Sequence, residues 1–534
     1  MTRRTVLIGL DGSTFSIHDP LMRDGVMPCL SRLIRDGVRA NLRTVIPALT
    51  PPAWTSLTTG RGPGSHGIFD FFRLASTKSR QLKLLTSRDI ACETVWELAS
   101  RNGLRSTVIN FPLTYPAPAI DGFVVPGWMP WKQVKLGCYP KGLYERIREL
   151  PEFDPHILGF DFALEEKSLE GCAPEEYAGW IDFHIRKERQ LHRILRMLMK
   201  EDPCELTAIM FDGVDKLQHL FWRFIDPAFL GESPTDWELE IRGKCLDYFR
   251  EIDGIIEEIV DLAGGDATIV LASDHGFGAQ EATLFVNHWL AERGYLAWAG
   301  EAPKAAEFAV RGLGKIGHHA QLIDWSRTKA YALTPSGNGV HIVREGESGQ
   351  GGVTDAEYDG FRERLCEELK ELVHPVTNER LVKEIWTREE AFAGPFIELA
   401  PDLTLVLSDG GLVSILAAEA AVQPMAVPTG THRPEGIFVA HGPGLRSGAA
   451  LDEISILDVA PLMVHSLGLP VPGDYEGCVP LEAYEPAALK ERPVRTSDAS
   501  DAAAAPGVKK DAPALDSEAE EEIVERLRSL GYLD

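Results

Sequence analysis

The stretch TVLIGLDG, residues 5–12, sets the pattern on which the fold prediction rests. β-Forming and apolar residues run without interruption into a carboxylate and a glycine. A continuous apolar run of this kind is typical of a strand that is covered on both faces of its sheet. Later stretches repeat the pattern, each followed by a polar, proline-containing or glycine-containing turn: 39–45, 106–109, 207–210, 268–272 and 437–440.

Helical segments separate these predicted strands. Residues 181–199 and 239–262 carry apolar residues mainly at three- and four-residue spacing, which is typical of one buried helix face. Alternating strands and helices predict an α/β fold, with a central sheet flanked by helices on both faces. Ligands in such sheets bind outside the carboxyl ends of the strands. We therefore expect the functional side chains to include Asp11, Asn110, Asp215, Asp274 and His275.

Two long segments interrupt this alternation. Residues 112–169 are rich in Pro, Trp and Tyr, and residues 281–402 carry mixed signals. We interpret both as cap insertions within one catalytic domain that spans residues 1–485. Because such connecting segments commonly carry binding residues, the caps are expected to set substrate choice.

The end of the chain has a different composition. Residues 486–516 are rich in Ala, Asp, Pro and Lys, which predicts a flexible linker. Residues 517–534 predict a final helix, because Ser517 and Glu520 have the spacing of a capping box. This helix would either dock onto a partner or fold back onto its own body.

Charge and composition restrict the partners. A formal net charge of −26 argues against a long nucleic acid or an anionic membrane surface as a partner. The 8 cysteines include no C-x-x-C pair, so neither a disulfide scaffold nor a structural zinc site is indicated. Apolar runs are too short for a membrane span or a signal peptide, so we expect a cytoplasmic location. The sequence leaves the oligomeric state open.

Thr50 stands at the expected start of a helix, in the stretch ALTPPAWTSLTTG, residues 48–60. Prolines directly after a threonine are typical of a helix first turn, which predicts Thr50 as the N-cap. A phosphate bound there would meet the positive end of the helix dipole. On this stretch alone, plain N-capping is the better explanation of Thr50.

Pairs of acidic residues and histidines follow two other predicted strands. Asp215 and His219 are four residues apart at the start of a probable helix, so both side chains lie on one face and can hold one cation. Asp274 and His275 are adjacent in a turn directly after a strand. Two such pairs, each at a strand end, favour metal binding over isolated structural histidines.

Five separated stretches resemble the motifs of the type I phosphodiesterase/nucleotide pyrophosphatase branch of the alkaline phosphatase superfamily. They occur in the order that the family has. They are LIGLDG (7–12), ALTPPAWTSLTTG with SHGIFDF (48–60 and 65–71), DGVDKLQH (212–219), LASDHGFG (271–278) and GTHRPEGIF (430–438). The resemblance implies an alkaline phosphatase-like central sheet with cap insertions.

The resemblance also implies two divalent metal ions and a ligand set for each. One set is Asp215, His219 and His432; the other is Asp11, Asp274 and His275, together with the Thr50 oxygen. Carboxylate and imidazole ligands suit Zn²⁺, which is the ion expected from the family, and also permit Mn²⁺ or Fe²⁺.

A mechanism follows from this arrangement. A threonine hydroxyl is too weakly acidic to ionise unaided, so a metal ion must lower its pKa before it attacks phosphorus. We expect a small phosphate ester as substrate, with phosphodiester or nucleotide pyrophosphate bonds cleaved through a phospho-threonine intermediate on Thr50. Asn110 would donate a hydrogen bond to a phosphate oxygen, or would only form a turn.

Several alternatives were weighed. A sulfatase needs a Cys or Ser that is convertible to formylglycine, and a cofactor-independent phosphoglycerate mutase would use serine, so Thr50 disfavours both. A phosphomonoesterase or a phosphonate hydrolase would use the same site, and a non-catalytic binding or regulatory protein would keep the same fold. Among other residues, Lys216 would neutralise substrate charge or, as the better interpretation, is a solvated surface lysine. Asp70 is interpreted as structural, and Trp128 as either a stacking surface or cap core.

Overall fold

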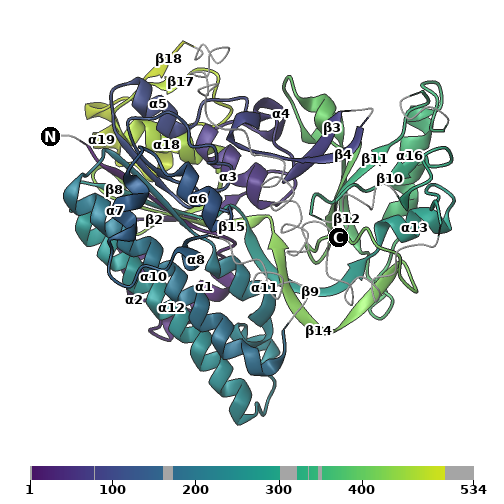
Figure 1. Ribbon diagram of the computed structural model, residues 1–534, viewed down its shortest axis with the longest axis horizontal. Coiled ribbons are helices and arrows are strands. Elements are labelled where there is room, and N and C mark those ends of the chain that lie inside the picture. The colour runs from purple at the N-terminus through teal and green to yellow at the C-terminus, as the bar shows by residue number, and fades with distance from the viewer. Residues whose placement is uncertain are drawn as a thin grey trace.

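The computed structural model describes residues 3–76, 79–159, 172–300, 322–334, 336–346 and 351–498 (Figure 1). An 8-stranded sheet forms its centre. The strands follow in the order β16 (Ala449–Ser455), β2 (Val38–Arg43), β15 (Glu435–His441), β8 (Thr268–Ala272), β1 (Thr5–Leu10), β7 (Leu206–Phe211), β5 (Ser106–Ile109) and β6 (Gly122–Val125). All residues of β1, β7 and β8 are buried, as their continuous apolar runs predict.

One strand of this sheet runs against the others. β15 pairs antiparallel with both β2 and β8, whereas the remaining neighbours pair in parallel. The carboxyl ends of the parallel strands therefore meet at one edge of the sheet, and the amino end of β15 lies at that same edge. Residues just before β15 consequently reach the place where the parallel strands end.

Helices cover both faces of the sheet (Figure 1). α10 (Tyr177–Glu201) and α12 (Asp236–Ala263) pack together, and α2 (Pro28–Asp36) joins them. α3 (Thr50–Thr59), α5 (Val95–Arg101) and α18 (Val459–Ser466) lie on the other face. α12 begins after Thr235, which with Glu238 forms a capping box. The predicted α/β class, with a central sheet flanked by helices, is confirmed.

A second, 4-stranded sheet has a hydrophobic core of its own, with Trp289 and Leu403 among its buried residues. Its strands are β10 (Ala330–Tyr331), β11 (Gly339–Ile342), β13 (Leu403–Leu407) and β12 (Val382–Thr387), with α13 (Val286–Glu292) and α16 (Tyr358–Lys370) beside them. A ribbon of β9 (Gly276–Leu284) and β14 (Val422–Arg433) runs between the two sheets (Figure 1). This sheet contains β13, so it extends past the expected cap boundary at residue 402.

The remaining elements are short. They are α1 (Phe15–Arg23), α4 (Pro63–His66), β3 (Phe72–Ser76), β4 (Ser79–Leu84), α6 (Trp131–Gly137), α7 (Leu143–Arg148), α8 (Pro155–Leu158), α11 (Gly213–Ile225), α17 (Arg388–Ala391), β17 (Val471–Pro472), α19 (Pro486–Glu491) and β18 (Thr496–Ser497), with 3-10 turns at Ser87–Asp89, Pro174–Glu176, Pro227–Phe229, Ile397–Leu399, Ile456–Asp458 and Leu481–Ala483. Within the described residues, the model contains no helix that combines the length and the apolar character needed to cross a membrane.

Two predicted boundaries need correction. The expected insertion at 112–169 includes β6, which pairs with β5 and extends the central sheet, so this strand belongs to the body. The expected linker from 486 begins too early, because α19 and β18 are ordered elements and Leu489 and Val494 pack against the main core. The rest of that linker, from residue 499, and the expected helix at 517–534 lie outside the described residues.

Candidate metal centre

Six of the expected functional side chains lie together at the edge where the parallel strands end. Asp11 follows β1, Asp274 and His275 follow β8, Asp215 and His219 stand on α11, and His432 precedes the end of β14. All six are buried. They form two groups with metal-ligand geometry, Asp215–His219–His432 and Asp11–Asp274–His275, which we call the first and the second ligand group.

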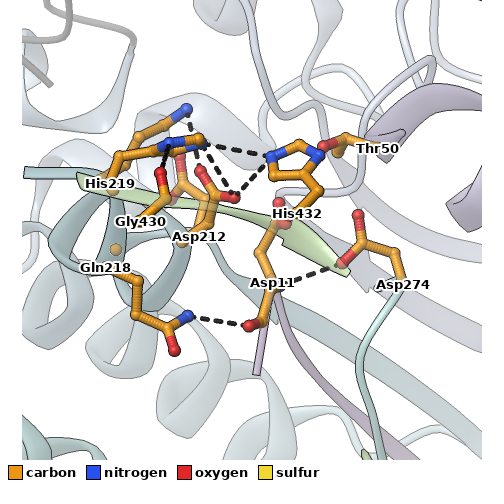
Figure 2. A network of polar contacts seen from close by, with 12 residues as sticks. Asp11, Thr50, Asp212, Gln218, His219, Asp274, Gly430 and His432 are labelled. Atoms are coloured by element: carbon orange, nitrogen blue, oxygen red, sulfur yellow. Dashed lines mark hydrogen bonds and ion pairs between the residues drawn. The ribbon is translucent and has the colours of Figure 1, made fainter. Parts of the chain in front are cut away.

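The first ligand group takes two members from one helix turn. Asp215 Oδ1 lies 3.6 Å from His219 Nε2 and 3.4 Å from His432 Nε2. The two imidazole Nε2 atoms are themselves 3.2 Å apart (Figure 2). Spacing of four residues places Asp215 and His219 on one face of α11, and the end of β14 delivers His432 to it.

The second ligand group lies beside Thr50. His275 Nε2 is 3.3 Å from Asp274 Oδ2 and 3.7 Å from Asp11 Oδ1. The Thr50 hydroxyl oxygen is 3.5 Å from the same nitrogen. The rings of His275 and His432 stack at 3.7 Å, so the two groups adjoin.

Backbone carbonyls fix the tautomer of all three imidazoles. His219 Nδ1 contacts the Gly430 carbonyl at 3.0 Å, and His432 Nδ1 contacts the Ala48 carbonyl at 2.9 Å. His275 Nδ1 contacts the Gly276 carbonyl at 3.1 Å. Because a carbonyl only accepts hydrogen bonds, each Nδ1 donates and each Nε2 presents a lone pair, as metal-binding histidines do.

The carboxylates in this centre interact unfavourably with one another. Burial, with the neighbouring charges of Asp274 and Asp215, raises the pKa of Asp11 well above its usual range. Burial is the main cause that raises the pKa of Asp274 to about 7, and the negative charge of Asp215 raises it further. The hydrogen bond that the Gly12 N–H donates to Asp274 opposes this shift. Burial alone would raise the pKa of Asp215 too, but His219, His432 and Lys216 lower it.

These groups fit divalent cations. Within the described part of the chain, both oxygens of Asp11 and of Asp215, and Oδ2 of Asp274, accept no hydrogen bond although they are buried. Buried polar atoms normally have partners, so the unpaired oxygens and the facing Nε2 lone pairs indicate a missing positive charge. The donor set of carboxylate oxygens and imidazole nitrogens suits Zn²⁺ and permits Mn²⁺ or Fe²⁺.

Thr50 is the first residue of α3 and not its N-cap, which corrects the expectation from the sequence. The N-cap is Leu49, whose carbonyl accepts the Ala53 N–H at 3.0 Å. The Thr50 hydroxyl lies 3.5 Å from His275 Nε2 and is directed toward that ring. Plain N-capping therefore does not explain this threonine.

Comparison with known proteins gives the family. The sequence profile described as type I phosphodiesterase / nucleotide pyrophosphatase matches residues 5–438. This chain belongs to that family. It is a phosphoric ester hydrolase.

The solved structures to which the chain is similar are distant in sequence. Phosphonoacetate hydrolase from Sinorhizobium meliloti 1021, in complex with phosphonoformate, is 16% identical, with 87% of this chain and 96% of that chain covered and a TM-score of 0.48. Murine ectonucleotide pyrophosphatase/phosphodiesterase 5 with AMP is 12% identical, with coverages of 88% and 95% and a TM-score of 0.48. The human protein is 14% identical, with coverages of 92% and 99% and a TM-score of 0.46. No curated protein matches the sequence.

Asn110 directly follows β5, so it too lies at the edge of the central sheet where the parallel strands end. Its backbone has a φ of 64°, an uncommon conformation for a residue other than glycine. Its side-chain amide donates to the Met210 carbonyl at 3.0 Å and to Asp212 Oδ1 at 3.3 Å. The structure therefore places this amide against the residues that precede α11, and its role in substrate binding stays a prediction.

Lys216 differs from its sequence-based interpretation as a surface lysine, whereas Trp128 agrees with one of its two, burial in a packed core. Lys216 is 1% exposed, so it is not a solvated surface lysine. Its Nζ lies 4.5 Å from the centre of the Trp128 ring, and that ring stacks on Phe71 at 5.6 Å. Both are buried, and the contacts with Lys216 and Phe71 give Trp128 a packing role in this structure.

His66 is not a metal ligand in this structure. The Ile68 N–H donates to His66 Nδ1 at 3.1 Å, so Nε2 carries the proton and donates to Ser56 Oγ at 2.9 Å. Burial lowers the pKa of this imidazole to about 3, so it stays neutral. His66 thus ties α4 to the helix that begins with Thr50.

A buried polar network beside the first ligand group was missed from the sequence. Lys187 Nζ pairs with Asp212 Oδ2 at 2.8 Å, and Glu188 Oε1 accepts the Gly213 N–H at 2.9 Å and the Tyr248 hydroxyl at 3.1 Å. One signal was present in the sequence. Lys187 falls on the apolar stripe of α10, whose buried members include Trp180, His184, Lys187, Leu191 and Ile194.

Proposed function

We propose that this enzyme hydrolyses phosphodiester or nucleotide pyrophosphate bonds, with Thr50 as nucleophile and two divalent metal ions. The observation that carries this proposal is the buried Thr50 hydroxyl, 3.5 Å from His275 Nε2 and beside both ligand groups. Zn²⁺ is the expected ion, and Mn²⁺ or Fe²⁺ also fit the donors. The residues proposed to hold it are Asp215, His219 and His432 in the first group and Asp11, Asp274 and His275 in the second.

Divalent cations in these groups would lower the pKa of the threonine hydroxyl and offset the charge that develops on the attacking and leaving oxygens. The Thr50 hydroxyl proton passes through solvent to the leaving group, and the Thr50 oxygen forms a bond to phosphorus while the bond from phosphorus to the leaving oxygen breaks. The leaving group departs with that electron pair. Water then attacks the phosphorus of phospho-Thr50, the bond from phosphorus to the Thr50 oxygen breaks, and a proton of the attacking water regenerates the Thr50 hydroxyl.

The chain itself supplies the orientation for this reaction. Thr50 lies at the positive end of the α3 dipole, which favours a phosphoryl group at that position. Burial of Thr50 and of both ligand groups keeps bulk water from competing for the same charges. Asn110, at the adjacent strand end, is proposed to donate a hydrogen bond to a phosphoryl oxygen.

The proposed substrate is a small ester and not a polymer. The net charge of −26 repels polyanions, whereas cations in the two ligand groups would attract a single phosphate locally. A phosphomonoester or a phosphonate would use the same nucleophile and ligands. Turnover measured with different substrates therefore decides which leaving group the enzyme releases.

The test uses the full-length protein with added Zn²⁺ or Mn²⁺ and with EDTA. We expect metal-dependent turnover of bis-p-nitrophenyl phosphate that exceeds turnover of p-nitrophenyl phosphate. A preference for the monoester would assign the chain to phosphomonoester hydrolysis. Absence of metal-dependent turnover of both compounds would contradict catalysis and favour a binding or regulatory role.

A stereochemical experiment tests Thr50 separately. Two successive in-line displacements predict retention of configuration at phosphorus for a chiral phosphorothioate diester. Inversion would exclude a covalent intermediate on Thr50 while leaving metal-dependent hydrolysis in place.

A further inference from the structure

Lys216 is a buried ammonium next to a proposed metal ligand. It follows Asp215 on α11 and is 1% exposed. Burying an ammonium costs free energy unless charges and dipoles compensate for it, so its position calls for an explanation. Its Nζ lies 3.6 Å from Asp215 Oδ2 and 4.5 Å from the centre of the Trp128 ring.

The two oxygens of Asp215 face different neighbours. Oδ1 lies within 3.4 Å of His432 Nε2 and 3.6 Å of His219 Nε2, the lone pairs that would share a cation. Oδ2 lies toward Lys216. The carboxylate therefore stands between the first ligand group and the ammonium, with one oxygen presented to each.

Trp128 is held in place for this contact. Its φ of 58° is rare for a bulky residue, and backbone strain of this kind persists only where the surroundings fix it. One ring face stacks on Phe71 and the indole also carries the Lys216 contact. The lysine ammonium thus rests against a ring that is itself buried and packed.

The start of α11 is fixed independently. Asp212, three residues before Asp215, pairs with Lys187, and the Gly213 N–H donates to Glu188. Both partners come from α10, and Tyr248 of α12 joins them through Glu188. These contacts fix the backbone of the first turn of α11. The orientation of the Asp215 carboxylate is what they leave to be fixed.

We propose that Lys216 is a positioning residue that holds Asp215 with Oδ1 toward the cation of the first ligand group, and that Trp128 positions Lys216. This inference rests on the proposed function, because it assumes that the first ligand group binds a metal ion. Partners that orient a metal ligand commonly contribute 10- to 100-fold to metal affinity. Lys216 acts through Asp215 and not by touching substrate.

The test is a calorimetric titration of the EDTA-treated, full-length protein with Zn²⁺ alone. Wild-type protein is expected to bind two equivalents, and the equivalent that is absent in Asp215→Ala marks the first ligand group. Lys216→Met removes the charge and keeps the chain length. It should weaken that equivalent by roughly 10- to 100-fold and change the other by less than about threefold.

Lys244→Met is the matched control. Lys244 stands on the neighbouring α12 and pairs with Asp182 at the surface, 30% exposed, far from any proposed ligand in sequence. It should leave both equivalents unchanged. Trp128→Leu keeps Lys216 but removes the ring beside it, and should weaken the same equivalent by a smaller factor.

Three outcomes would overturn the inference. In the first, Lys216→Met binds both equivalents as wild type does. In the second, it loses affinity for both equally, which would mean a general effect on the fold. The third applies if the variant is unfolded. If circular dichroism shows Lys216→Met unfolded, Trp128→Leu decides: selective weakening supports the inference and unchanged binding overturns it. Wild-type protein that binds no Zn²⁺ would instead contradict the proposed metal centre itself.

Discussion

The two ligand groups have the same number of side chains but are built differently. The first combines one carboxylate with two imidazoles, and two of its members share a helix turn. The second combines two carboxylates with one imidazole, and its members come from the ends of the adjacent strands β1 and β8. Thr50 approaches the second group, whereas Lys216 contacts the first.

Under the proposed mechanism, this difference would separate two tasks. The second group lies beside the Thr50 hydroxyl, so a cation there would lower the pKa of the threonine. Two imidazoles and one carboxylate would leave more net positive charge on a cation in the first group. That cation would accordingly suit the leaving oxygen.

Loss of the Thr50 hydroxyl should have the largest effect. Thr50→Ala is expected to lower kcat by roughly 10⁴-fold or more, because removing a nucleophile eliminates the covalent route. Both metal equivalents should still bind, since the ligand side chains remain. Thr50→Ser keeps a hydroxyl and serves as the control, and turnover by Thr50→Ala comparable to wild type would remove the assignment of nucleophile.

Removal of one carboxylate from each group tests whether the groups are separate sites. Asp215→Ala and Asp274→Ala are each expected to bind one equivalent of Zn²⁺ in place of two and to lose roughly 10³-fold in kcat/KM. Metal content after dialysis and steady-state kinetics provide the measurement. Loss of both equivalents in either variant would show one shared site and contradict the division into two groups.

Loss of folding stability in acid limits how low the pH can be when the two ligand groups are compared. Burial lowers the pKa of His18 to about 4 from 6.5, and His18 lies outside both groups, beside Met27 and Phe249. The unfolded chain therefore binds more protons between those values, so stability falls as pH drops from about 6.5 to about 4. The loss attributable to His18 is about 3 kcal/mol at most.

His18→Leu should remove this part of the acid sensitivity. Urea unfolding at pH 7 and at pH 4.5 gives the difference in free energy of unfolding for each protein. The drop between the two pH values should be smaller in His18→Leu than in wild type. An equal drop in both proteins would place the acid sensitivity elsewhere.

Metal binding at each single site should stabilise the fold by a slightly smaller amount. At a free Zn²⁺ concentration about 100 times Kd, the free energy of unfolding is expected to rise by about 2.7 kcal/mol over the EDTA-treated protein for each independent site. Asp215→Ala should show this gain for one site only. Thermal unfolding that is unchanged by Zn²⁺ in wild-type protein would contradict metal binding to the folded state.

The sequence was most informative where a local pattern determines position. A buried strand followed by a polar turn placed Asp11 and Asp274 at one sheet edge, and helical spacing paired Asp215 with His219. His432 has no such local signal and came only from the family resemblance. The structure brings it to the edge through the antiparallel β15, which follows it directly.

The errors arose where tertiary contacts override local composition. A lysine in a helix is usually solvated, whereas Lys216 is buried beside Asp215 and beside Trp128, which is remote in the sequence. Prolines and aromatics around a short strand predict an insertion where β6 lies, and the small number of large apolar residues predicts a linker where α19 lies. Side-chain preference predicts Thr50 as the N-cap, whereas Leu49 takes that position through its carbonyl, which accepts the Ala53 N–H.

The antiparallel strand β15 also has a consequence for biosynthesis. Asp215 and His219 leave the ribosome well before His432 does. At about 5–20 residues per second, at least about 10 s separate them. The first ligand group therefore cannot close until His432 has emerged, so a nascent chain should acquire its full metal complement, and with it any hydrolytic capacity, only after that point.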